Sequence, residues 1–272
     1  MEDMSLLVGL AALVMVIGAI AGVLAGLLGI GGGIVLVPAF YYTFAALGFD
    51  SAQLMQICLG TSLATIIVTS IRSALAHNKK GAVDWDILKT WMPGIVIGAA
   101  IGVWIAAALR SEALQIIFAA LAMIVGLYMS FGKSGWRLGA TMPSGAIRAV
   151  LSPALGFLSV LMGIGGGSFG VPLMSLFNVA IHRAVATAAG FGVIIAVPSV
   201  VGFLLLDVAH APPLTIGAVN LVAFGLVVAM TLITAPWGAA LAHRMDPGPL
   251  KKVFGVFLAL VALNMARKAM GW

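Results

Sequence analysis

A glycine-rich phrase occurs twice in this chain, and its backbone could do chemistry. The first copy is Gly29-Ile30-Gly31-Gly32-Gly33, followed by Val37-Pro38, and the second is Gly163-Ile164-Gly165-Gly166-Gly167, followed by Val171-Pro172. Such a density of glycine, with a proline close behind, is expected to break a helix. A helix that restarts after the break presents unpaired N–H groups and the positive end of its dipole. Two restarts that converge could therefore bind an anion without a buried cation.

The substrate-binding residues predicted from this pattern are the glycines and nearby hydroxyl side chains. They are Gly31, Gly32, Gly33, Gly165, Gly166, Gly167, Ser168, Thr61, Ser62 and Thr187. Glycine lets the backbone approach a ligand closely, and Ser168 could cap the second half-helix or donate its hydroxyl to an oxyanion. The first copy has Ile34 at the equivalent position, so the site would be asymmetric. The alternative is that the glycines only permit close helix crossing, while the hydroxyls bond to the backbone or to neighbouring helices.

Three basic residues near predicted helix ends could act in gating or in anion attraction. They are Arg72, His182 and Arg183. Close to an interface, however, a long basic side chain can reach water and serve only as a signal of membrane topology. The sequence leaves both interpretations open.

Catalytic and metal chemistry is not predicted. The histidines are isolated, with no pair at i and i+4, and the single cysteine, Cys58, excludes an intrachain disulfide and a multi-cysteine metal site. The acidic residues lie at or near predicted loops, which argues against a carboxylate-driven cation carrier. No Gly-x4-Gly-Lys phosphate-binding loop occurs, and no nucleophile and base visibly converge. We therefore expect no cofactor, no metal and no enzymatic activity.

The composition shows what kind of elements must position these residues. The chain of 272 residues is 62% hydrophobic and 8% charged, with a mean hydropathy of +1.20. These values are typical of a polytopic membrane protein, so the lipid bilayer is an expected partner beside a small anionic substrate. The basic residues are scattered among short loops, so nucleic acid is not an expected partner.

The first apolar run, Ser5 to Leu28, is expected to stay in the mature protein. A homo-oligomer is compatible with the sequence.

The duplication extends beyond the glycines and divides the chain. Further matching pairs are Leu114-x3-Phe118 with Leu250-x3-Phe254, Gly81-x-Val83-Asp84 with Gly217-x-Val219-Asn220, Gly102 with Gly238, and, at a shorter offset, Thr61-Ser62 with Thr187-Ala188. Such repetition predicts one transmembrane repeat over 1–131, a linker over 132–145 and a second repeat over 146–272. Asp84 and Asn220 are predicted helix caps.

The distribution of basic residues predicts how the two repeats are oriented. If each glycine phrase is the tip of a hairpin that returns the chain to its starting side, eleven basic residues share one face of the membrane. They are Arg72, Lys79, Lys80, Lys89, Lys133, Arg137, Arg148, Arg183, Arg244, Lys251 and Lys252, against Arg110, Arg267 and Lys268 on the other face. The positive-inside rule favours this model, with both termini outside. The predicted fold is therefore all-α and polytopic. It has two inverted repeats, each with a glycine-rich broken helix or re-entrant hairpin plus about three full transmembrane helices.

In combination, these motifs resemble the sulfite exporter TauE/SafE family over nearly the whole chain. The residues that carry the resemblance are the repeated Gly-x-Gly-Gly-Gly-x4-Pro, Gly60-Thr61-Ser62-Leu63-Ala64, His182-Arg183-Ala184-Val185-Ala186-Thr187 and Ile216-Gly217-x-Val219-Asn220. The resemblance implies a bacterial inner-membrane permease for sulfite, sulfoacetate, other sulfonates or thiosulfate. One departure is Thr187-Ala188, where the family often has a Thr-Ser pair. An anion channel, or a structural membrane partner without carrier activity, is the alternative.

Overall fold

The computed structural model describes residues 2–28, 32–49, 51–132, 136–242 and 247–271. Its elements are α1 (Glu2–Leu28), α2 (Gly33–Ala46), α3 (Leu54–Lys79), α4 (Trp85–Ala108), α5 (Ser111–Phe131), α6 (Gly145–Leu161), α7 (Gly167–Leu176), α8 (Ile181–Leu204), β1 (Thr215–Ile216), β2 (Val219–Asn220), α9 (Leu221–Ala242) and α10 (Pro247–Ala269). With 79% of its residues helical, the protein has the predicted all-α class. Gly31, one of the predicted site residues, lies outside the described residues.

Two helices form the centre of the molecule, and the others surround them. The most apolar windows of α3 and α8 are 78% and 67% buried, whereas that of α9 is 28% buried. The outer helices expose large apolar side chains such as Trp104, Phe131 and Val253. Among the described residues, five helices are long and apolar enough to cross a membrane, namely α3, α4, α5, α8 and the Leu221–Gly238 part of α9. An apolar outer surface of this kind suits lipid, as expected for a multi-pass membrane protein.

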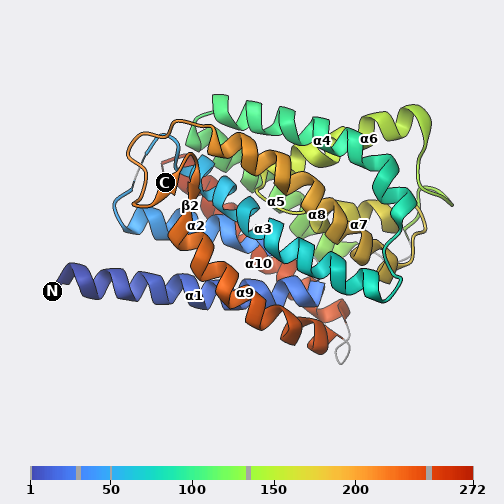
Figure 1. The fold of residues 1–272 in the computed structure, drawn as a ribbon, viewed down its shortest axis with the longest axis horizontal. Helices are drawn as coiled ribbons and strands as arrows, with labels where there is room; N and C mark the ends of the chain where they lie inside the picture. Colours follow the sequence, from blue (N-terminus) through green and yellow to red (C-terminus); the bar gives the residue numbers. More distant parts are fainter. Residues whose placement is uncertain (1, 29–31, 50, 133–135, 243–246, 272) are drawn as a thin grey trace.

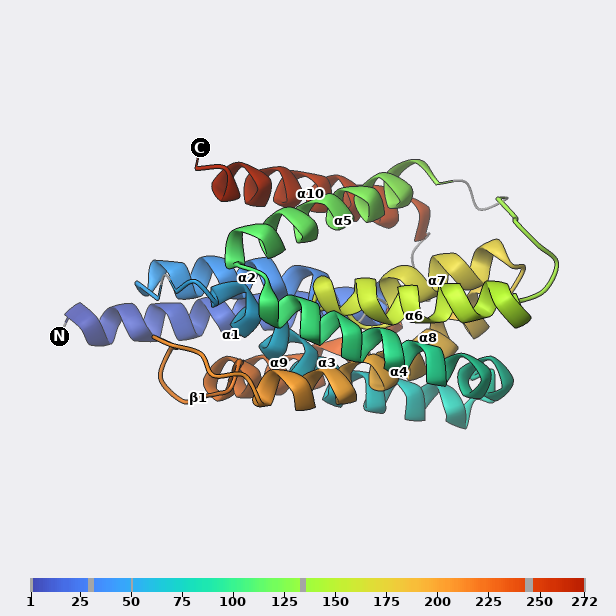
Figure 2. The ribbon, with the colours of Figure 1, turned by 90° about the horizontal axis from the view of Figure 1, so that it is seen from above.

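The outer helices pack in pairs that join the two halves of the chain. α1 packs on α9, α6 on α4, and α10 on α5, and the last pair lies to one side of the other helices in Figure 2. Small residues allow two of these contacts. A Cβ atom placed on Gly102 would lie 2.9 Å from Cβ of Val160, and one on Gly22 would lie 2.9 Å from Cα of Thr231. Gly22 and Gly102 therefore permit close helix crossing.

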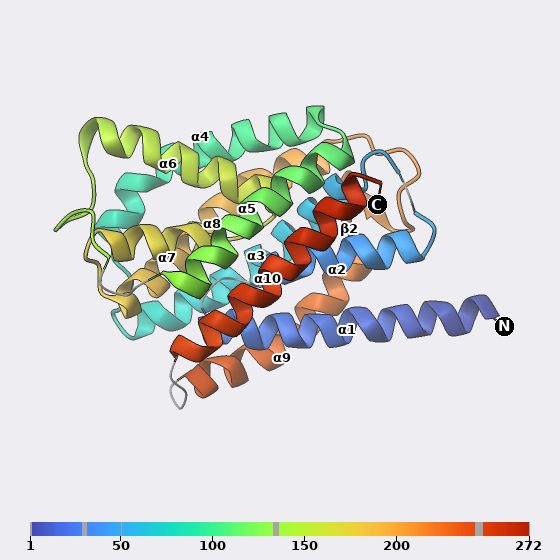
Figure 3. The ribbon, with the colours of Figure 1, turned by 180° about the vertical axis from the view of Figure 1, so that it is seen from behind.

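The two glycine phrases each separate a long helix from a short one. α2 has 14 residues and α7 has 10, too few to span a bilayer, as the sequence predicted. Figure 1 shows both chain termini at the same end of the molecule, and α2 and α7 towards opposite ends. α1 runs away from the end that holds the termini, while α6 runs towards it, and each continues into a short helix that turns back (Figures 1 and 3).

Candidate functional site

The start of α2 lies against the loop that leads into α7. A Cβ atom placed on Gly33 would lie 2.6 Å from the carbonyl oxygen of Gly163 and 3.1 Å from Cα of Ile164. Gly32, the N-cap of α2, has a left-handed backbone with φ of 72°, and Gly163 also has a positive φ, of 59°. Glycine adopts this conformation without the strain that a side chain adds. The two helix breaks therefore meet inside the protein.

The second glycine phrase is wedged between the two central helices. A Cβ atom on Gly166 would collide with Cβ of Phe191, and would lie 2.6 Å from the carbonyl oxygen of Ala188 and 3.0 Å from the backbone nitrogen of Gly192, all on α8. On the α3 side, a Cβ atom on Gly165 would lie 3.2 Å from Cγ2 of Ile66. Only a residue without a side chain fits at Gly166, because two of its three neighbours on α8 are backbone atoms that cannot rotate away.

The Ser168 hydroxyl is buried at the start of α7 and has no hydrogen-bond partner. The side chain is 3% exposed. The sequence predicted that Ser168 either caps this helix or binds an oxyanion, but α7 begins after Gly166 with no side-chain cap hydrogen bond. The Ser159 hydroxyl, just before the second break, is also fully buried and unpartnered. Since a buried hydroxyl without a partner costs free energy, the Ser168 hydroxyl is available to donate a hydrogen bond to an acceptor.

Ser62 holds the second break in place. Its hydroxyl donates to the carbonyl oxygen of Gly163 at 2.7 Å, and Thr65 in turn donates to the carbonyl oxygen of Ser62 at 2.7 Å. The structure thus brings Ser62 to the break, as predicted, and gives it a positioning contact. Its oxygen can still accept a hydrogen bond.

Thr61 and Thr187 occupy matching positions in the two halves. Thr61 accepts a hydrogen bond from the backbone N–H of Asn220 at 2.9 Å, and Thr187 accepts one from the backbone N–H of Asp84, also at 2.9 Å. Both threonines are fully buried. Each hydroxyl therefore fixes the start of a neighbouring helix, and its O–H proton remains as a hydrogen-bond donor.

The predicted caps Asp84 and Asn220 are confirmed. Asp84 accepts from the backbone N–H of Ile87 at 3.1 Å at the start of α4, and Asn220 accepts from that of Ala223 at 2.9 Å at the start of α9. The halves differ in charge here, because the carboxylate of Asp84 also pairs with Arg183.

The three basic residues predicted for gating or anion attraction lie at the surface. Nη2 of Arg183 lies 2.8 Å from Oδ2 of Asp84, and the two side chains are 57% and 20% exposed. Arg72 and His182 are exposed on α3 and α8. The structure therefore places no charged group from this set beside the buried breaks.

We expect Asp84→Ala to lower the free energy of unfolding by about 1–2 kcal/mol, because it removes both a helix cap and an exposed ion pair. Asp84→Asn keeps the cap and removes only the pair, so its cost should stay below about 1 kcal/mol. Asp86→Ala, at the next acidic position of α4, is the matched control. Thermal unfolding of the purified protein in detergent measures the difference. Equal losses for both Asp84 variants would show that the ion pair, and not the cap, stabilises this end of α4.

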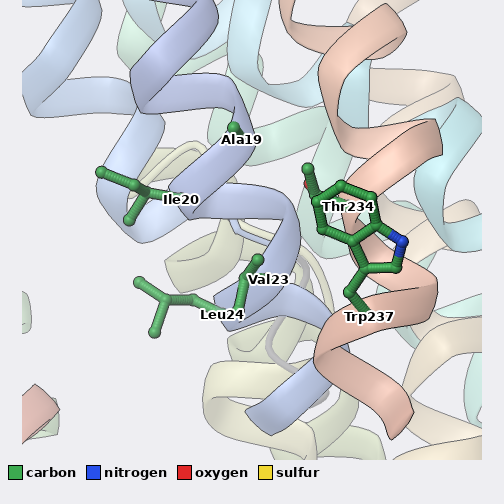
Figure 4. A pocket seen from close by; sticks show the side chains of 6 residues that line it. All are labelled: Ala19, Ile20, Val23, Leu24, Thr234 and Trp237. Carbon is green, nitrogen blue, oxygen red and sulfur yellow. The ribbon is translucent and has the colours of Figure 1, made fainter. Parts of the chain in front are cut away.

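A shallow pocket of about 290 Å³ between α1 and α9 is not a second polar site. It is lined by Ala19, Ile20, Val23, Leu24, Thr234 and Trp237 (Figure 4). The Thr234 hydroxyl donates to the carbonyl oxygen of Met230, so it does not need a ligand. Ile20 and Trp237 are 51% and 64% exposed, which suits a surface that faces lipid chains. In the part of the chain that the structure describes, no group of three or more His, Cys, Asp or Glu could hold a metal ion.

Comparison with known proteins assigns the chain to a family. The model of the family described as sulfite exporter TauE/SafE matches residues 14–265. The chain belongs to this family. A probable membrane transporter protein of Haemophilus influenzae is 32% identical over 261 residues, covering 94% of this chain and 98% of the relative. The probable membrane transporter protein YunE of Bacillus subtilis is 28% identical over 278 residues, covering 93% and 96%. No solved structure matches significantly. This TauE/SafE member is therefore a membrane transporter.

Some residues that build the site in this TauE/SafE member were not predicted. Gly192 and Phe191 form the α8 wall of the second break, and the buried Ser159 hydroxyl precedes it. The only local signal was the pair of glycines Gly190 and Gly192, since small residues are common where helices cross closely. Ser159 gave no signal, because one serine in an apolar helix has no distinguishing pattern.

Proposed function

We propose that this protein is a secondary transporter of small sulfur-containing anions, such as sulfite, sulfoacetate, other sulfonates or thiosulfate, in the inner membrane of a bacterium. The observation that carries this proposal is the contact between the start of α2, at Gly33, and Gly163 in the loop that leads into α7, whose first turn holds the unpartnered hydroxyl of Ser168. Free N–H groups and a hydroxyl suit an oxyanion, and transport sites are commonly built from broken helices. The family description, sulfite exporter, points to the same class of substrate.

We further propose that the two halves are inverted repeats that rock around this site. The opposite directions of α1 and α6, and the matching contacts of Thr61 with Asn220 and of Thr187 with Asp84, support this. A carrier with this symmetry can expose one central site to each side of the membrane in turn. The surrounding lipid and the anion are its proposed partners, and a homo-oligomer is compatible with the fold.

Reconstitution into liposomes tests the proposal. We expect saturable, protein-dependent uptake of labelled sulfite. Uptake of the label should be faster when the vesicles are preloaded with unlabelled sulfite, because internal sulfite binds to the inward-facing carrier and is carried out as the site returns to the outside. Methanesulfonate, a sulfonate with one negative charge, should compete for this uptake. Flux that does not saturate and shows no counterflow would favour an anion channel, and the absence of any protein-dependent flux would favour a structural membrane partner.

A further inference from the structure

The site at the two breaks contains partial charges but no full charge. Every described polar side chain that is buried is a hydroxyl or a carboxamide of Ser, Thr, Asn or Gln, and none is Lys, Arg, His, Asp or Glu. Residues 29–31, which the structure does not describe, are Gly, Ile and Gly in the sequence and add no ionisable side chain. An anion bound here is therefore balanced only by backbone dipoles and hydroxyl groups.

The nearest basic residue along α3 does not change this balance. The side chain of Ser70 faces α8, because a Cβ atom placed on Gly192 would meet Cβ of Ser70 at 3.1 Å. Arg72 follows two residues later, about 200° further around the helix, and is exposed. Arg183 is held by Asp84. Neither guanidinium is available as a partner for an anion at the breaks.

The available positive charge amounts to about one elementary charge. Each helix start is equivalent to roughly +0.5 charge, and the start of α2 at Gly33 lies against Gly163, in the loop that leads into the start of α7. The Ser168 hydroxyl adds a donor independently of these dipoles. One negative charge is thereby balanced, whereas a dianion would retain about one uncompensated charge among apolar neighbours such as Ile66 and Phe191. The Born cost of leaving water is also about four times as large for two charges as for one.

We infer that this site selects by charge and carries its substrates as monoanions. Sulfite would pass as hydrogen sulfite, and sulfonates that carry a single negative charge would be favoured over sulfate and thiosulfate. This inference rests on the proposed transport function, and it names the charge class of the substrate at the same site.

Methanesulfonate and sulfate test the inference, because they share a tetrahedral sulfur and a similar size but differ by one charge. In proteoliposomes, we expect protein-dependent methanesulfonate flux at least about tenfold above sulfate flux. Labelled sulfite, measured at equal pH on both sides, should move more slowly as the pH rises and the dianion replaces hydrogen sulfite. Protein-free liposomes give the background that arises from diffusion of sulfur dioxide.

Variants connect the selectivity to the site. Ser168→Ala should raise KM for methanesulfonate at least about tenfold, since a hydrogen bond to a charged group is lost. Ser175→Ala removes another buried, unpartnered hydroxyl from the far end of α7 and should leave KM unchanged. An unchanged KM in Ser168→Ala would overturn the assigned site.

The failures can be told apart. Sulfate flux equal to or above methanesulfonate flux would overturn the charge inference and leave the transporter in place. If neither of these two anions moves, the pH dependence of sulfite flux decides, and a rise with pH overturns the inference. If sulfite does not move either, the proposed function fails and the charge inference fails with it.

Discussion

Gly166→Val should abolish anion flux while the amount of inserted protein stays the same. The new side chain would collide with Phe191 and meet the backbone of Ala188 at 2.6 Å and that of Gly192 at 3.0 Å. These atoms belong to central helix α8, so the loop before α7 must move instead. Overpacking of this kind costs about 1–3 kcal/mol, which a membrane helix bundle can tolerate, but a displacement of the α7 start destroys a binding geometry. Flux in proteoliposomes, normalised to inserted protein, measures the effect.

Gly225→Val is the matched control, because a Cβ atom at this position on α9 would meet nothing within 4 Å. We expect its flux to stay within about twofold of the unaltered protein, since the added side chain would face lipid. If Gly166→Val fails to insert, Gly165→Ala provides a milder test, because its Cβ atom would lie 3.2 Å from the side chain of Ile66. Normal flux in an inserted Gly166→Val protein would contradict the idea that the backbone must approach the anion closely.

Local signals in the sequence were sufficient for the helical class and for the two helix breaks, whereas the short β1–β2 hairpin before α9 was not predicted. The apolar runs predicted the membrane helices, because length and hydropathy alone decide whether a segment can span a bilayer. The glycine phrases predicted where the short helices α2 and α7 begin, since glycine and proline act on the backbone directly. The caps Asp84 and Asn220 were equally local, because each bonds an N–H group only three residues later.

The contacts that assemble the site could not be predicted in the same way. Ser62 bonds Gly163 across 101 residues, and Thr61 bonds Asn220 across 159. No helical or turn pattern carries such information, because these partners are brought together only when α3 packs against the second half of the chain. The repeat predicted that Thr61 and Thr187 are equivalent, but the structure was needed to show that both hydroxyls accept hydrogen bonds from helix starts. For Ser168, the sequence allowed a cap or an anion ligand, and the structure lacks the cap hydrogen bond.

In each half of the molecule, a buried threonine accepts a hydrogen bond from the backbone of a helix-capping residue, but the capping residue is charged in one half and neutral in the other. In one half, Thr187 bonds to Asp84, whose carboxylate also pairs with Arg183. In the other half, Thr61 bonds to Asn220. The amide of Asn220 donates to the carbonyl oxygen of Pro213 and to the hydroxyl of Thr215. An ion pair that is partly exposed weakens with salt, and a neutral network does not. If the halves rock against each other, the end that holds Arg183 should open more easily at high ionic strength.

A cysteine at position 138 and one at position 270 should be labelled from opposite sides of the membrane. Leu138 lies between α5 and α6, and Met270 follows α10 at the end of the molecule that holds the termini (Figure 1). Both side chains are well exposed, at 72% and 62%. The native Cys58 is fully buried and should give little background.

The orientation follows from the described basic residues. Those at the ends of helices on the Leu138 side are Lys79, Lys80, Lys89, Arg137, Arg148, Arg183 and Lys252, against Arg110, Arg267 and Lys268 on the other. Since the positive-inside rule places the richer side in the cytoplasm, a membrane-impermeant maleimide should label Met270→Cys in intact cells and Leu138→Cys only after permeabilisation. The unaltered chain is the control for background. Labelling of both variants from one side would contradict the hairpin arrangement, and the reverse pattern would keep the hairpins but turn the protein over.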